Sequence, residues 1–352
     1  MWQTLYDILE QGQAAVLATI VFQQGSAPRG AGSQLVVSAD GRMAGTVGGG
    51  LVEARTLEAC RALLRDGISV ASVLDFSLDG SLAARSDMIC GGHVRVLLEP
   101  CLPDAPTLAV VGAVRDSQRQ EGCLLARPFP PQGERPALAA WTLLRPDGRE
   151  WAGAPLPTEA RRAWDARAPR TLPQEEAVML EVAGGGYFVE ACLPPCHMII
   201  AGGGHVSRPT AQVAALAGFA VTVLDDRAEY AAAARFPTAR QTRVTPGFTD
   251  CFDALCVGER TYIIIVTRGH VFDGRVLAQA LRTPARYIGM IGSRRKREEV
   301  YAALRREGFT EQELRRVHCP VGLPIGAETP EEIAVSIVAQ CIACRRGESR
   351  AM

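Results

Sequence analysis

The sequence predicts an α/β protein of two domains, in which an α+β domain precedes a parallel sheet covered by helices on both faces. Its 352 residues exceed the roughly 250–300 that one hydrophobic core usually holds. Two adjacent prolines, Pro194 and Pro195, mark a change of pattern, because apolar runs alternate regularly with helical segments only after them. We therefore place the N-terminal domain over residues 1–195 and the C-terminal domain over residues 196–352.

The N-terminal domain is expected to mix short helices with antiparallel strands. Apolar residues at helical spacing predict helices over residues 2–11 and 53–64. The dipeptide Asp40-Gly41 supplies the positive φ of a tight hairpin turn. Strands are predicted at 14–21, 33–38, 42–47, 70–76, 94–98, 108–114, 138–144 and 187–191.

One short segment of this domain resembles another. The residues Arg145-Pro146-Asp147-Gly148-Arg149 echo Ser38-Ala39-Asp40-Gly41-Arg42. Asp-Gly turns are common in hairpins. We therefore interpret the echo as a chance similarity in preference to an ancient duplication of the sheet.

The C-terminal domain shows the pattern of a parallel sheet. Continuous apolar runs, which are typical of strands buried on both faces, predict strands at 198–201, 220–224, 262–267 and 287–291. The last helix is predicted over residues 331–345. Thr329 is its N-cap, Pro330 its first residue, and Glu332 completes a capping box.

A glycine-rich turn follows the first of these strands and indicates a Rossmann-type nucleotide site. The pattern G-x-G-x-x-S allows a tight turn and brings amide groups against a phosphate at a helix N-terminus. An acidic pair lies about 20 residues further on, at the offset of a ribose-binding carboxylate. Ser207 replaces the third glycine and so departs from an ordinary NAD site. The candidate contacts are Gly202, Gly203, Gly204, His205, Asp225 and Asp226; the alternative is a scaffold that has kept its turn without a ligand.

Two later loops are candidates because ligands bind outside the carboxyl ends of parallel strands. Arg268 and His270 follow the strand at 262–267, and His270 could transfer a proton or simply bond a neighbouring loop. Ser293 and Arg294 follow the next strand and open a helix, where they could contact an anion. A solvated basic helix face is the alternative for this second loop.

The eleven cysteines form no regular framework and are interpreted as reduced thiols. Cys341 and Cys344 form a CxxC pair within a predicted helix, with no second pair nearby, so we expect thiols of the helix core. Cys90 lies in a glycine-flanked loop, where a thiolate would suit a soft metal or a sulfur-transfer step. A buried, inert cysteine is the alternative at that position.

The charge balance argues against two classes of partner. The formal net charge is +0, with 38 basic and 38 acidic residues, so neither nucleic acid nor an anionic membrane is expected to attract the chain. The N-terminus lacks the pattern of a secretion signal, and no apolar stretch approaches a membrane span. We expect a cytoplasmic protein.

Taken together, these motifs resemble the XdhC/CoxI family, the maturation factors of xanthine and carbon monoxide dehydrogenases. The resemblance covers both ends of the chain. The region between about residues 101 and 190 contains no motif of the family. The matching segments are 25–29, 40–41, 48–53, 90–92 leading to 99–100, 202–206, 225–227, 268–270, 288–296, 319–323 and 329–334.

The resemblance implies a chaperone that binds molybdenum cofactor, as molybdopterin or its cytidine dinucleotide form, in preference to an enzyme that turns over a metabolite. Its implied partners are an apo molybdenum hydroxylase, a cysteine desulfurase that supplies sulfur, and a second copy of the chain. Cys90 would serve the metal–sulfur end of the cofactor. A first-domain anion loop would comprise Arg29, Gly48, Gly49 and Gly50, unless these residues only shape the hairpin.

A different function class remains open at this point. The Rossmann half could belong to an NAD(P)-dependent oxidoreductase with His270 as its acid–base group. Asp225 would then favour NAD over NADP, because a carboxylate repels a 2′-phosphate.

Overall fold

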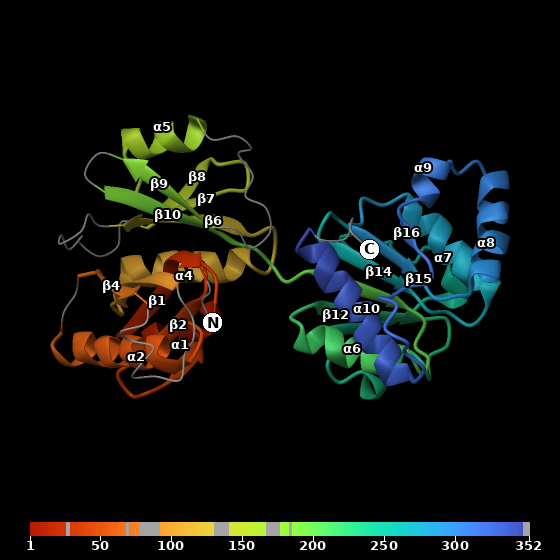
Figure 1. Ribbon diagram of the computed structural model, residues 1–352, viewed down its shortest axis with the longest axis horizontal. Helices are drawn as coiled ribbons and strands as arrows, with labels where there is room; N and C mark the ends of the chain where they lie inside the picture. Colours follow the sequence, from red (N-terminus) through yellow and green to blue (C-terminus); the bar gives the residue numbers. More distant parts are fainter. Residues whose placement is uncertain are drawn as a thin grey trace. The chain divides into compact units, whose positions relative to one another are not determined.

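The computed structural model describes residues 1–25, 29–67, 70–77, 92–129, 141–166, 177–182 and 185–347. The chain divides into two compact units, Met1–Pro194 and Pro195–Met352, each with its own sheets (Figure 1). The expected α/β class is confirmed, since the first unit contains antiparallel sheets and the second a six-stranded parallel sheet.

The first sheet of the N-terminal unit has the strand order β3-β2-β1-β5-β4, and all its pairs are antiparallel. Helix α1 precedes it and helix α2 separates β3 from β4. The elements are α1 (Trp2–Glu10), β1 (Ala15–Gly25), β2 (Gln34–Ser38), β3 (Met43–Gly45), α2 (Gly50–Arg65), β4 (Ser72–Ser77) and β5 (Gly92–Cys101).

The second sheet has the order β8-β7-β6-β10-β9 and is also fully antiparallel. Helix α4 precedes it and helix α5 separates β8 from β9. The elements are α4 (Ala105–Ser117), β6 (Cys123–Phe129), β7 (Thr142–Leu144), β8 (Glu150–Gly153), α5 (Thr158–Ala166), β9 (Ala177–Val182) and β10 (Gly185–Cys192).

Helix α4 corrects one prediction, because residues 108–114 were expected to form a strand. The Asp104 carboxylate accepts a hydrogen bond from the amide of Thr107 at 2.8 Å and caps the helix. Pro106 lies in the first turn, where its missing N–H costs nothing. These start signals outweigh the strand preference of the valines that follow.

Alternation along the strands divides the core of the N-terminal unit into layers. Val16, Ala18 and Ile20 of β1 pack in one cluster with residues of α2. Leu124 and Ala126 of β6 pack likewise with residues of α5. The other faces of both sheets share a cluster with α1 and α4, so the two sheets enclose one common core.

The C-terminal unit is a parallel sheet of order β13-β12-β11-β14-β15-β16. Its strands are β11 (His197–Ala201), β12 (Ala220–Asp225), β13 (Gln241–Val244), β14 (Thr261–Ile265), β15 (Tyr287–Met290) and β16 (Val317–His318). Its α-helices are α6 (Ser207–Leu216), α7 (His270–Leu281), α8 (Arg294–Arg306), α9 (Glu311–Leu314) and α10 (Pro330–Arg345), and two short 3₁₀ turns lie at Ala233–Arg235 and Pro246–Phe248.

Helices cover both faces of this sheet, as expected for parallel strands. Ile199 and Ile263 face a cluster that includes residues of α7 and α8, whereas Met198 and Ile200 face one that includes residues of α6 and α10. Figure 1 shows α6 and α10 side by side and α7 beside α8. The predicted capping box of Thr329 and Glu332 is present at the start of α10.

Two further expectations concern residues that the structure describes. Cys341 and Cys344 are buried in α10, as predicted for helix-core thiols, and the ten described cysteines are free. Among the described helices, none is long and apolar enough to cross a membrane.

Candidate functional site

The glycine turn between β11 and α6 is held in place by close backbone packing. Gly202 has a φ of 111°, and a Cβ there would lie 2.3 Å from the carbonyl oxygen of Val266. A Cβ on Gly203 would lie 2.3 Å from the carbonyl oxygen of Tyr230. Both positions therefore require glycine, because any side chain would collide with backbone atoms that cannot give way.

Gly204 differs, because its surroundings are open. A Cβ at this position would meet no atom within 4 Å. Within residues 185–347, the amides of Gly204, His205 and Val206 donate to no acceptor, as is usual for amides at the start of a helix. The turn thus presents free donors at the N-terminus of α6, where the helix dipole favours an anion.

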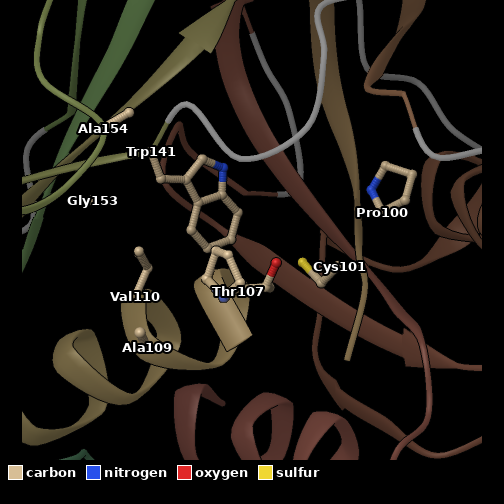
Figure 2. Close-up of a pocket in the computed structure, with 9 residues that line it drawn as sticks. Pro100, Cys101, Thr107, Ala109, Val110, Trp141, Gly153 and Ala154 are labelled. Carbon is tan, nitrogen blue, oxygen red and sulfur yellow. The ribbon is translucent and has the colours of Figure 1, made fainter. Parts of the chain in front are cut away.

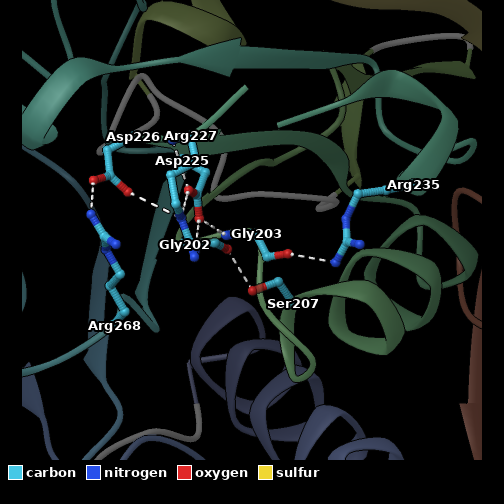
Figure 3. A network of polar contacts seen from close by, with 8 residues as sticks. All are labelled: Gly202, Gly203, Ser207, Asp225, Asp226, Arg227, Arg235 and Arg268. Atoms are coloured by element: carbon cyan, nitrogen blue, oxygen red, sulfur yellow. Dashed lines mark hydrogen bonds and ion pairs between the residues drawn. The ribbon is translucent and has the colours of Figure 1, made fainter. Parts of the chain in front are cut away.

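Ser207 explains how the third position of the motif tolerates a side chain. Its hydroxyl donates to the carbonyl oxygen of Gly202, and the residue is fully buried in the first turn of α6. The serine therefore stabilises the turn through its bond to Gly202 (Figure 3). The space at Gly204 stays open, because a Cβ there would meet no atom within 4 Å.

Asp225, the last residue of β12, is turned toward the glycine turn. Its carboxylate accepts a bond from the Gly203 amide at 2.7 Å and another from the side chain of Arg227 at 3.0 Å (Figure 3). Burial opposes ionisation of Asp225, but the bonds from Arg227 and Gly203 outweigh it and hold its pKa below the ordinary value. Both carboxylate oxygens are therefore engaged by the protein itself.

Asp226 links this turn to the loop after β14. Its carboxylate accepts a 2.6 Å bond from Arg268, so the structure brings two predicted residues together. Arg227 lies over the ring of Tyr230, with 3.5 Å between its guanidinium carbon and the ring centroid. The carbonyl group of the same Tyr230 packs against Gly203, so the acidic pair and the glycine turn are connected by direct contacts.

A second polar group at this edge of the sheet was not among the predicted site residues. Asp273, fully buried in the first turn of α7, accepts bonds from the amide and hydroxyl of Thr267 at 3.2 and 2.6 Å. Its carboxylate also forms an ion pair with Lys296 of α8. Burial raises the pKa of Asp273. One sequence signal could have indicated this ion pair. Asp273 lies in the helix after β14 and Lys296 in the helix after β15, and these two strands are neighbours in the sheet.

The remaining predicted residues of this unit lie around the helix starts. His205 and His270 are exposed; His270 begins α7 and lines a groove of about 520 Å³ between α7 and α8. The Ser293 hydroxyl accepts from the Lys296 amide at 3.3 Å and caps α8, and Arg294 is exposed at its first position. Ser293 thus has a structural role of its own.

The predicted anion loop of the N-terminal unit carries an internal carboxylate. Gly48 and Gly49 have φ values of 114° and 74°, and they lead into α2 at Gly50. The Glu53 carboxylate accepts bonds from the Thr46 hydroxyl and from the amides of Val47 and Gly49, both at 3.2 Å. These bonds, that from Thr46 foremost, lower the pKa of Glu53. An incoming anion would have to share these donors.

The structure describes only one of the two other residues predicted for this unit. Arg29 is exposed, whereas Cys90 lies outside the described residues. Among the residues that are described, no three His, Cys, Asp or Glu side chains gather as a metal site.

The N-terminal unit also contains a small apolar pocket of about 290 Å³. Figure 2 shows the indole of Trp141 beside Thr107 and Cys101, which line it together with Pro100, Pro106, Ala109, Val110, Gly153 and Ala154. Burial raises the pKa of the Cys101 thiol, so the pocket offers no thiolate to a metal.

Two family models match this sequence. The model described as the XdhC Rossmann domain matches residues 198–341, and the model of the XdhC and CoxI family matches residues 8–77. Together they cover the parts of both units that hold the two glycine loops.

Curated relatives were found at 26% identity. A probable xanthine dehydrogenase subunit of Bacillus subtilis (strain 168) is matched over 98% of this chain and 98% of its own length. The molybdenum cofactor insertion chaperone PaoD of Escherichia coli (strain K12) is matched over 96% of this chain and 86% of its length. The protein YqeB of the same strain is matched over 95% of this chain, which spans 44% of YqeB.

A solved structure shares the fold. The crystal structure of a xanthine dehydrogenase from Bacillus halodurans superposes with a TM-score of 0.79 at 23% identity. The match covers 99% of this chain and 97% of the other.

Proposed function

Because this chain belongs to the XdhC and CoxI family, we propose that it binds molybdenum cofactor and delivers it to an enzyme of the xanthine dehydrogenase type. The observation that carries the proposal is the open turn at Gly204, with the free amides of Gly204, His205 and Val206 at the start of α6. Molybdopterin bears a phosphate, and its dinucleotide form bears two, which such a turn can bind.

The residues present fit the phosphate end of this cofactor. The three amides would hold the phosphate, and no side chain fills the space in front of Gly204. Two exposed arginines lie after neighbouring strands: Arg268 in the loop after β14, and Arg294 at the start of α8. When bound, the cofactor supplies the molybdenum centre that the client enzyme uses, while this chain binds and protects it.

The finer steps rest on Cys90 and on partner proteins. We propose that Cys90 contacts the metal–sulfur end, that a cysteine desulfurase supplies the sulfur, and that the recipient is an apo molybdenum hydroxylase. We also propose that the chain self-associates. The name of PaoD, a cofactor insertion chaperone, supports the delivery role.

An NAD(P)-dependent oxidoreductase is the second candidate, because Asp225 ends β12 where a ribose-binding acid is expected. The geometry favours the first proposal. The Asp225 carboxylate is already bonded to Gly203 and Arg227, so a ribose hydroxyl would compete with these bonds.

The test is to purify the protein from cells that make molybdenum cofactor, and to measure bound molybdenum, pterin and nicotinamide dinucleotide. We expect pterin near one equivalent per chain and no nicotinamide dinucleotide. If nicotinamide dinucleotide is bound and the protein transfers hydride from it to an acceptor, the second candidate is correct instead.

A matched pair of variants locates the bound cofactor. Gly204→Val places a side chain in the open space, so pterin content should fall about tenfold or more while folding is retained. Gly258→Val is the control, because its Cβ also meets no atom within 4 Å but the residue precedes β14, at the amino end of the sheet. Equal pterin in both variants would exclude the turn as the binding site.

A further inference from the structure

The two sheets of the N-terminal unit follow the same plan. In the residues that the structure describes, each half of the unit contains a helix, three strands, a second helix and two strands in that order, and the strand orders β3-β2-β1-β5-β4 and β8-β7-β6-β10-β9 correspond one to one. We refer to residues 2–101 as the first half and to residues 105–192 as the second half. The second half includes most of the region in which the sequence offered no motif.

The strand registers give the residue equivalences. Leu17 pairs with Glu99 in the first half, and Leu125 pairs with Glu190 in the second. Ala18 pairs with Leu35, and Ala126 pairs with Thr142. The same offset makes Thr19 equivalent to Arg127 and Gln34 equivalent to Trp141.

The hairpins agree in atomic detail. The amide of Ser38 donates to Arg42, as that of Arg145 does to Arg149. The carboxylates of Asp40 and Asp147 both accept from the amide two residues on.

The hairpins also end alike. Gly45 and Gly153 share a φ of 84°, and a Cβ on either would lie 2.2 or 2.1 Å from the carbonyl oxygen of Gln34 or Trp141 respectively. The similarity of 38–42 to 145–149 is therefore part of a larger correspondence, which favours a duplication over chance similarity.

The two halves meet in a buried network that repeats this correspondence. Gln34 of the first half donates to Glu190 of the second at 2.6 Å. Trp141 of the second half donates to Glu99 of the first at 2.8 Å. Exchanging each residue for its equivalent turns one bond into the other, which is the signature of a twofold relationship.

Arg127 and Thr19 lie where this approximate twofold axis passes. The Arg127 guanidinium is fully buried and contacts Glu99, Glu190 and, at 2.9 Å, the hydroxyl of Thr19. The two equivalent positions thus face each other, and one arginine serves both carboxylates. An arginine at position 19 or at position 127 would therefore reach both Glu99 and Glu190.

We propose that the second half is a duplicate of the first, and that the face of the first half bearing Thr19, Gln34 and Glu99 is an interaction surface for a module of its own kind. In this chain the partner is supplied by residues 105–192. This inference does not depend on the proposed function.

The duplication also separates the roles of the halves. Residues Gly48, Gly49 and Gly50 are matched in the second half by Leu156, Pro157 and Thr158, at the same distance from the start of the helix. Only the first half has the glycine loop. We therefore assign the second half the role of packing against the first half within the same chain.

The test exchanges the two axial residues in the full chain. All four tryptophans lie in the N-terminal unit, at positions 2, 141, 151 and 164, so fluorescence follows the unfolding of that unit alone. Arg127→Thr should lower the midpoint of thermal unfolding by several degrees, because it leaves two buried carboxylates without a cation. Adding Thr19→Arg should restore at least half of that loss.

Gln23→Arg in the Arg127→Thr background is the control, since Gln23 is exposed on the same strand and its arginine should restore nothing. If Arg127→Thr alone does not fold, the double exchange should still give a protein that unfolds cooperatively. Recovery of less than half, or recovery equal to that of the control, would overturn the proposal.

Discussion

The amide of Gly203 donates a 2.7 Å hydrogen bond to the buried carboxylate of Asp225, so the acid that ends β12 also holds the glycine turn that follows β11. This contact links two segments that are 22 residues apart. It places a negative charge beside the amides proposed to bind phosphate.

Asp225→Asn tests the consequence of that charge. The loss of a charge-assisted bond should lower the free energy of unfolding by about 1–2 kcal/mol. Removing the negative charge should strengthen binding of inorganic pyrophosphate, measured by calorimetry at low salt. Weaker pyrophosphate binding by a folded variant would mean that the Asp225 carboxylate supports the anion site directly.

Lys296→Met tests the buried ion pair with Asp273. Because the acid is fully buried, loss of its cation should lower the free energy of unfolding of the C-terminal unit by about 3 kcal/mol. Circular dichroism during urea unfolding measures this loss. Adding Asp273→Asn should recover part of it by removing the unpaired charge; a double variant less stable than Lys296→Met would contradict this account.

Glu53 predicts how the N-terminal unit responds to acid. Bonds from Thr46 and the loop amides hold the pKa of Glu53 below its ordinary 4.5, so the folded state favours the ionised form. Its contribution to stability is complete above that ordinary value and is lost as the pH falls through the lower folded value. Unfolding followed by tryptophan fluorescence between about pH 5 and pH 3 should therefore show a smaller acid-induced loss for Glu53→Gln than for the parent chain. Parallel curves would contradict the prediction.

Cys90→Ala tests the thiol implied by the family resemblance. The variant should keep the tryptophan-detected unfolding midpoint but should lose bound molybdenum and fail to reconstitute an apo dehydrogenase, because the soft ligand is gone. Cys256→Ala, at an exposed cysteine of the C-terminal unit, is the control. Unchanged reconstitution by Cys90→Ala would remove this residue from the site.

The sequence predicted four of the six strands of the parallel sheet, each to within two residues at both ends, because strands buried on both faces are continuous apolar runs. It missed the short strands β13 and β16, whose residues are exposed or half-buried and form no apolar run. It failed at α4, where the capping signals of Asp104 and Pro106 were outweighed in our interpretation by a run of valines. The glycine turn could be predicted because its residues are adjacent in sequence.

The buried networks could not be predicted in this way. Arg127 and Glu190 are 63 residues apart, and Gln34 and Glu190 are 156 apart. No periodicity or spacing connects such residues, because their proximity depends on how two sheets pack against one another. The duplication was visible in sequence only at its hairpin, since the other equivalent positions hold different residue types, such as Thr19 and Arg127.

Both glycine loops carry a carboxylate from their own chain, Glu53 in one and Asp225 in the other. A phosphate that arrives at either loop gains less than it would at a bare one, since some donors are already engaged and a like charge stands nearby. We therefore expect that a phosphate bound at either loop is opposed by a like charge of the protein itself, and that this repulsion is relieved when the phosphate leaves.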